Sequence, residues 1–116
     1  MDAESFIKIL YESVIKDNNN LYKESFLNTN IDDAKDPYWQ DALKLYTELP
    51  EGKKDTLFKV IKQVQIDTLA TVLGVLDGVV FIENEDLDIR VTTKGDSELI
   101  SGDLLDLFLA YDEGNR

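Results

Sequence analysis

The sequence contains no cysteine and no histidine, and each absence excludes a class of chemistry. Without cysteine the chain has no disulfide and no thiolate nucleophile. Without histidine it has no imidazole base, and the lack of both residues removes essentially every ordinary zinc or copper site. Carboxylates are the reactive groups that remain, and we expect no cofactor, no metal ion and no catalytic residue.

Long apolar runs are also missing. No segment approaches the roughly 18–20 consecutive apolar residues that a membrane helix needs. No basic segment followed by an apolar run opens the chain, as it would in a secretory signal. We therefore expect a soluble, cytoplasmic protein with no membrane partner. The 116 residues fit a single domain, residues 1–116, because domains commonly contain about 100–200 residues.

Basic residues are scarce: 12 lysines and arginines stand against 24 acidic residues, for a net charge of −12. The imbalance is concentrated in residues 63–116, which hold 12 acids and only 3 bases. Such a surface repels nucleic-acid and anionic lipid phosphates and attracts a basic protein. An acidic surface that serves only solubility is the alternative interpretation. The six glycines are scattered, and none precedes the lysine-serine or lysine-threonine pair of a phosphate-binding loop.

The longest segment with apolar residues at helical spacing runs from Thr56 to Gly78. One stripe at steps of three and four contains Leu57, Val60, Ile61, Val64, Thr68, Thr71, Val72 and Val75. A second stripe contains Leu69, Leu73 and Leu76, so the later turns are apolar on most sides. Because a helix that is apolar all round is buried, we predict a central core helix. Asp67 lies on or beside the first stripe, where we expect a structural role; an acid with a perturbed pKa is the alternative.

Further helices are predicted on both sides of this segment. Asp17 and the three asparagines after it favour a helix end, because their side chains compete for backbone hydrogen bonds. Asp36 and Pro37 suit the N-cap and the first helical position of another helix, which Leu49-Pro50 ends. For residues 104–111 we predict a helix capped by Ser101 or Asp103, with a strand as the alternative. The expected helices are 3–16, a short one at 21–27, 37–49, 56–76 and 104–111.

A β-hairpin is predicted in the C-terminal third. Residues 79–82 are β-branched and aromatic, and residues 87–92 alternate between apolar and polar side chains. A short polar turn separates these two runs, and residues 98–100 are a candidate third strand. The predicted fold class is therefore α+β: mainly helical, with four to five helices around a central buried helix, plus a β-hairpin or small antiparallel sheet.

The C-terminal half also resembles a known class of protein. It contains the motifs Asp67-Thr68, Leu76-Asp77-Gly78 and Gly102-Asp103-Leu104 in the order helix, turn, hairpin and helix. In this it resembles the small acidic immunity proteins of bacterial toxin–immunity systems. The resemblance covers about fifty residues. It implies a non-enzymatic protein that binds a cognate toxin directly.

The charge pattern and this resemblance give one hypothesis: a cytoplasmic inhibitor that binds a basic protein, such as a nuclease toxin. Clustered acids would steer it onto a positive cleft and raise the association rate. The candidate partner-binding residues are Glu83, Glu85, Asp86, Asp88, Asp96 and Glu98, with Trp39 and Tyr111 as aromatic anchors. The acids of the predicted hairpin turn also suit a hard cation, but side chains on alternate faces favour a solvated turn instead.

Three other functions stay open at this point. The chain is alternatively a structural or regulatory interaction module that forms a homodimer through an apolar helix face. A nucleic-acid mimic that inhibits a DNA-processing protein fits the same charge. A small carboxylate-based enzyme would need a concave pocket with two acids whose pKa values are pushed apart.

Overall fold

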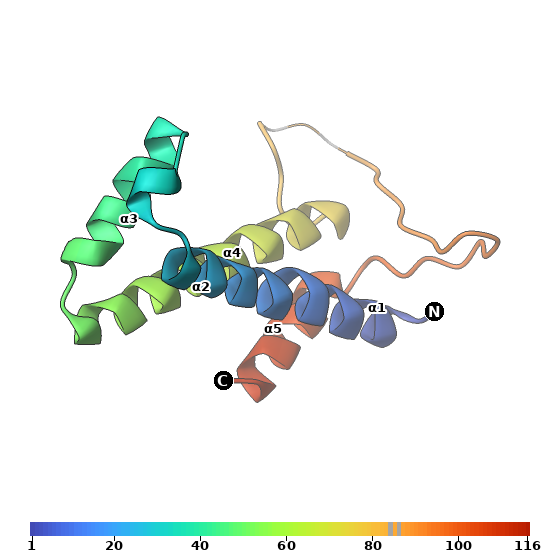
Figure 1. Cartoon of the computed structure of the whole chain (residues 1–116). Coiled ribbons are helices and arrows are strands. Elements are labelled where there is room, and N and C mark those ends of the chain that lie inside the picture. Colours follow the sequence, from blue (N-terminus) through green and yellow to red (C-terminus); the bar gives the residue numbers. More distant parts are fainter. Residues whose placement is uncertain (84, 86) are drawn as a thin grey trace.

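The computed structural model describes residues 1–83, 85 and 87–116, and within these residues the fold is helical (Figure 1). The elements are α1 (Ala3–Leu10), the π-helical η1 (Tyr11–Lys16), α2 (Asp17–Asn28), the 3-10 turn η2 (Ile31–Asp33), α3 (Pro37–Glu48), α4 (Glu51–Leu76) and α5 (Leu104–Gly114). The helices predicted from Asp36-Pro37 and over residues 104–111 are confirmed. Asp36 Oδ1 accepts a hydrogen bond from the Tyr38 backbone N–H at 2.9 Å, as an N-cap does.

The first three elements form one continuous helix, which we call the N-terminal helix (residues 3–28; Figure 1). The predicted end at Asp17–Asn20 is wrong. Asn19 is buried, and its amide group donates hydrogen bonds to the Ile15 carbonyl oxygen at 2.6 Å and to Gln65 Oε1 at 2.7 Å. The amide that was expected to compete with the helix therefore bonds within it and to α4. A tertiary contact reverses the local preference here.

Two apolar clusters hold the helices together, and both long helices contribute to both clusters. The first contains Ile7, Tyr11, Ile15, Ile66, Ala70, Leu73, Leu104 and Phe108. The second contains Phe26, Ala34, Leu43, Tyr46 and Phe58. α3 and α4 diverge from the Leu49-Pro50 corner, and the second cluster fills the angle near it (Figure 1). The Cα radius of gyration is 17.8 Å, well above the value of about 13 Å for a compact domain of this length.

The buried face of α4 is not the one that the first stripe predicted. Val60, Val64 and Val72 are 54%, 58% and 49% exposed. Leu73, from the second stripe, is 1% exposed and lies in the first cluster. The prediction of a helix buried all round is therefore wrong, although α4 does pack against the N-terminal helix and α5. Two apolar stripes compete in this sequence, and periodicity alone does not say which one finds a partner.

The predicted β-hairpin is also wrong, and the fold class is corrected from α+β to α within the described residues. Residues 79–82 form no strand there, and β pairing is limited to one antiparallel bridge between Thr92 and Leu99. Ile100 N–H also donates to the Val91 carbonyl oxygen at 2.8 Å, so the second and third predicted strands meet at this point alone. An isolated hairpin is marginal in water without packing on one face. Phe81, in the first predicted strand, is 69% exposed and has no such packing.

The described helices include none that is both long enough and apolar enough to cross a bilayer.

Substituting alanine at Leu73 and at Val64 will distinguish the two stripes of α4. Leu73→Ala removes a buried side chain and should lower the free energy of unfolding by about 2–5 kcal/mol. Val64→Ala, at an exposed position, should change it by about 0.5 kcal/mol or less. Urea denaturation followed by circular dichroism measures both. An equal loss in the two variants would contradict the observed orientation of α4.

Candidate functional site

The segment between α4 and α5 projects from the helical body as a wide loop (Figure 1). We call residues 79–100 the arm; residues 84 and 86 within it lie outside the described residues. Large apolar side chains are exposed along the arm. They are Val79, Phe81, Ile82, Leu87, Ile89 and Leu99, with exposed fractions between 39% and 69%. Such side chains on an irregular segment are typical of a surface that a partner covers.

A single carboxylate holds the two ends of this loop together. Asp77, at the end of α4, accepts hydrogen bonds from three backbone N–H groups: Gly102 at 2.6 Å, Leu104 at 3.1 Å and Leu105 at 2.8 Å. Asp77 thereby caps the N-terminus of α5 from across the chain, where its charge also suits the helix dipole. Asp103, the cap that the sequence predicts, makes no side-chain capping bond. Ser101 instead accepts a hydrogen bond from the Val91 backbone N–H at 3.2 Å.

A second close contact, at Gly74, fixes the start of the arm against the end of α4. The Val79 and Val80 N–H groups both donate to the Gly74 carbonyl oxygen, at 2.9 and 3.1 Å. A Cβ atom placed on Gly74 would lie 2.5 Å from Val80 Cγ2, so only glycine lets Val80 pack here without a shift. Gly78 has the positive φ of 77° that the sequence predicts for this helix end. The base of the arm is therefore ordered by backbone contacts that residue types alone do not reveal.

The predicted acidic residues are placed on the arm, but they do not act as one cluster. Glu83 and Glu85 are exposed, whereas Asp86 lies outside the described residues. Asp88 forms an exposed ion pair with Arg90 at 3.3 Å. Asp96 accepts the Glu98 backbone N–H at 2.9 Å and so shapes a turn. Within the described residues, no three acidic side chains come together as a metal-binding group.

The two predicted aromatic anchors are held within the helical body. Trp39 is half-buried and packs on Phe26, with ring centroids 5.0 Å apart. Tyr111 is also half-buried, and its hydroxyl donates to Glu12 Oε1 at 2.9 Å. Among the described residues, the most exposed aromatic side chains are instead Phe81 on the arm, at 69%, and Tyr38, at 67%. Phe81 was assigned to a packed strand, so sequence reasoning missed it as a surface anchor.

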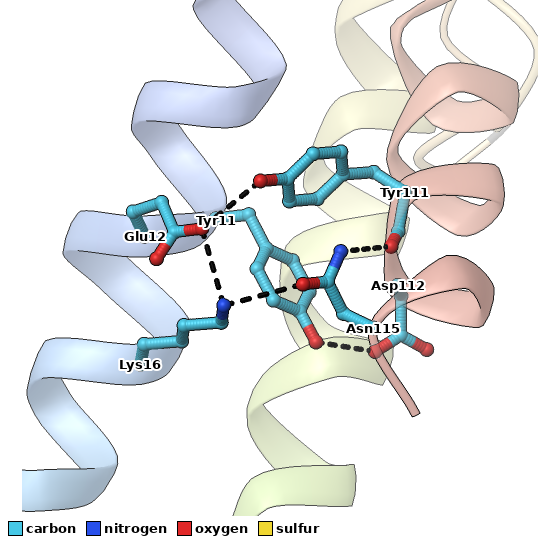
Figure 2. Close-up of polar contacts among 6 residues, drawn as sticks. All are labelled: Tyr11, Glu12, Lys16, Tyr111, Asp112 and Asn115. Carbon is cyan, nitrogen blue, oxygen red and sulfur yellow. Dashed lines mark hydrogen bonds and ion pairs between the residues drawn. The ribbon is translucent and has the colours of Figure 1, made fainter.

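Figure 2 shows the densest polar network, which joins the N-terminal helix to α5. Tyr11 donates its hydroxyl hydrogen bond to Asp112 Oδ1 at 2.7 Å, and both side chains are fully buried. Arg116 donates two hydrogen bonds to Asp112 Oδ2, at 3.0 and 3.1 Å. Lys16 bridges Glu12 and Asn115 at 3.2 Å each.

These contacts shift the pKa values of Tyr11, Tyr111 and Glu12. Burial, together with the hydrogen bond to Asp112, raises the pKa of Tyr11 well above its ordinary value of 10.0. The hydrogen bond to Glu12 raises the pKa of Tyr111. The same bond, with that from Lys16, holds the pKa of Glu12 below its ordinary value of 4.5. Both carboxylates of the network, Glu12 and Asp112, therefore accept hydrogen bonds, and the network links the N-terminal helix to α5.

No family model, curated protein or solved structure matches this chain.

The placement of Asp67 is now clear as well. Its side chain is exposed, and Oδ1 accepts a hydrogen bond from Gln63 Nε2 at 2.9 Å, one turn earlier on α4. The carboxylate is thus at the solvent-facing edge of the helix, in a local pair typical of surface positions.

Asp77→Asn tests the closure of the arm. Asparagine keeps the shape but loses the charge and one acceptor oxygen, so the free energy of unfolding should fall by about 1–2 kcal/mol. Limited proteolysis should cut the arm faster in this variant. Asp103→Ala is the matched control, because its side chain caps nothing, and it should alter neither quantity measurably. If Asp103→Ala had the larger effect, the assignment of the cap to Asp77 would be wrong.

Tyr11→Phe tests the buried network. The change removes one donor from Asp112 and should lower the free energy of unfolding at pH 7 by about 1–3 kcal/mol. Because the pKa of Tyr11 is raised in the folded chain, the unfolded chain loses this proton first as pH rises through 10.0. Wild-type stability should therefore be complete below pH 10 and decline above it. The decline should be shallower in Tyr11→Phe, with Tyr111 accounting for part of what remains. Urea denaturation between pH 7 and pH 11 measures this, and parallel curves would count against the assignment.

Proposed function

We propose that this chain is a non-enzymatic binding protein and that the arm is its contact surface for a basic protein partner. The observation that carries the proposal is the combination of exposed apolar and acidic side chains on one projecting segment. Phe81 is 69% exposed, and the apolar Ile82 and the acidic Glu83 follow it in the chain. Apolar anchors supply affinity in protein interfaces, and surrounding charges set the association rate and the choice of partner.

The construction of the arm supports a binding role. Its two ends are fixed by Asp77 and Gly74, whereas the described residues in its middle make few hydrogen bonds to the helices. An irregular segment on a helical scaffold is where binding residues commonly lie. Unsatisfied backbone groups along such a segment also allow a partner to add hydrogen bonds by pairing with it.

The narrower proposal is that the chain is an immunity protein, which binds and neutralises a cognate toxin in the cytoplasm. It rests on the negative charge of residues 63–116 and on the resemblance of the motifs that flank the arm. Asp77 and Gly78, which belong to one of these motifs, have structural duties at the base of the arm. The acids of the arm are the residues that would distinguish one partner from another.

Neutralising exposed arm acids tests the electrostatic part. Glu83→Gln, Glu85→Gln and Glu98→Gln are combined in one variant, because these side chains form no ion pair with a described residue. Binding to the protein encoded by the adjoining gene is measured by biolayer interferometry at several salt concentrations. The association rate should fall by about tenfold at low salt, and its salt dependence should flatten.

The matched control neutralises three exposed acids of the helical body, Glu24, Asp41 and Glu48, with the same change in net charge. It should leave the association rate within about twofold of wild type, if steering is local. Phe81→Ser should raise the dissociation rate without lowering the free energy of unfolding, since Phe81 is mostly exposed. Equal effects of the arm and body variants would refute an arm-centred interface.

A self-associating module is the second candidate, and one observation favours it. The outer face of α4 presents Val60, Val64 and Val72 to solvent, with the exposed Asp67 beside Val64. Pairing this stripe with a second copy would remove these large apolar side chains from water, although it would also bring Asp67 close to the interface. Sedimentation equilibrium separates the two functions: a homodimer that is insensitive to salt and is lost in Val64→Lys supports self-association.

A further inference from the structure

A groove lined by basic side chains, in contrast to the acidic arm, lies between the N-terminal helix and α4. It has a volume of about 450 Å³. Its lining comprises Lys16, Asn19, Asn20, Lys23, Asp55, Phe58, Lys59 and Lys62, and we call it the lysine groove. A second hollow of about 380 Å³ shares Lys59 and Lys62 with it and adds Arg116 and Asp112. Five of the 12 basic residues of the chain therefore line two adjoining hollows.

Four lysines and one acidic residue, Asp55, line the lysine groove, so its lining is basic overall. Lys16 pairs with Glu12 at 3.2 Å. Among the described residues, Lys23, Lys59 and Lys62 have no carboxylate within 4.0 Å, although acids outnumber bases two to one in the sequence. Like charges three residues apart on a helix, as at positions 59 and 62, repel each other. An anion between these ammonium groups would remove that repulsion.

Side chains in the lining of the groove contact one another and both helices. Asn19 is buried at its floor and bonds to both helices, through Ile15 and Gln65. Phe58 supplies an apolar wall, and Lys23 Nζ lies 5.8 Å from the centre of its ring. The π-helical segment η1 ends at Lys16, on the rim of the groove. π-Helical turns within α-helices are rare and are frequent at functional sites, which is an independent sign that this stretch is specialised.

We propose that the lysine groove binds a small organic molecule that carries a diphosphate group. Lysine ammonium groups bind phosphoryl oxygens as point charges, and a diphosphate places several negative charges on two adjacent groups, which suits lysines gathered around one hollow. The volume lies in the range of about 300–1,000 Å³ that is typical of small-molecule sites, so inorganic phosphate alone would leave most of it empty. The overall negative charge repels a long nucleic acid at a distance but acts less on a small anion beside three lysines.

Calorimetric titration of the full chain with ADP and with pyrophosphate at low ionic strength tests the proposal. Both probes should bind saturably with 1:1 stoichiometry, and inorganic phosphate should bind at least about tenfold more weakly, since it reaches fewer lysines at once. Citrate is the carboxylate probe of similar charge. Binding of citrate as tight as that of pyrophosphate would overturn the assignment of a phosphoryl ligand, and the absence of saturable binding of ADP and pyrophosphate would overturn the site.

Matched variants separate the groove from the general charge of the chain. Lys59→Gln with Lys62→Gln should weaken ADP binding by about tenfold or more, and Lys59→Arg with Lys62→Arg should restore most of it. Lys35→Gln with Lys44→Gln changes the net charge equally, but at exposed positions outside the groove, and should leave affinity within about twofold. Equal weakening by both glutamine pairs would show diffuse electrostatics and overturn the proposal. The arm variant with Glu83, Glu85 and Glu98 neutralised should bind ADP normally, so this result is independent of the proposed partner-binding function.

Discussion

The fold depends on the contact between two long helices, the N-terminal helix and α4. Each contributes side chains to both apolar clusters, so neither cluster is closed without them. The hydrogen bond between Asn19 and Gln65 fixes their register midway between the clusters. α5 completes one cluster with Leu104 and Phe108, and α3 completes the other with Leu43 and Tyr46. The elongated shape follows, because two small cores lie along one pair of helices rather than around a single centre (Figure 1).

This arrangement leaves two surfaces of opposite character. The loop between α4 and α5 is anchored by Asp77 but carries its apolar side chains outward, since the helices have already filled the first cluster. The cleft between the two long helices gathers lysines that form no ion pair with the described acids of the arm. The net charge of −12 does not reveal that one of these surfaces is acidic and the other basic. Electrostatic steering acts through local potential, and the two surfaces would select ligands of opposite sign.

The polar network of Tyr11, Asp112 and Arg116 illustrates how the chain stabilises buried charge. A carboxylate left alone in a core is costly, but Asp112 receives three hydrogen bonds. The same bonds tie the N-terminal helix to α5, which are separated by about a hundred positions in the sequence. Burial raises the pKa of Tyr11 above its ordinary value of 10.0, so its hydroxyl keeps the proton that it donates to Asp112 at neutral pH.

Most helices could be predicted from the sequence because their signals are local. Asp36-Pro37 begins α3, Leu49-Pro50 ends it, and Gly78 allows the backbone to leave α4. The acids of the arm could be placed on an exposed turn for the same reason. The arm could not be recognised as irregular, because alternation in residues 87–92 records side-chain type and not whether a second strand is available to pair with it.

The sequence by itself determined the positions of the helix boundaries with caps and prolines, the absence of thiol and imidazole chemistry, and the excess of negative charge. Tertiary structure alone decided which apolar stripe of α4 is buried, that Asp17–Asn20 continue a helix, and that Asp77 rather than Asp103 caps α5. The physical reason is common to all three. Each outcome depends on a contact with a residue far away in the chain. The local sequence pattern determines which interactions a residue is able to make, but not which distant residue it contacts.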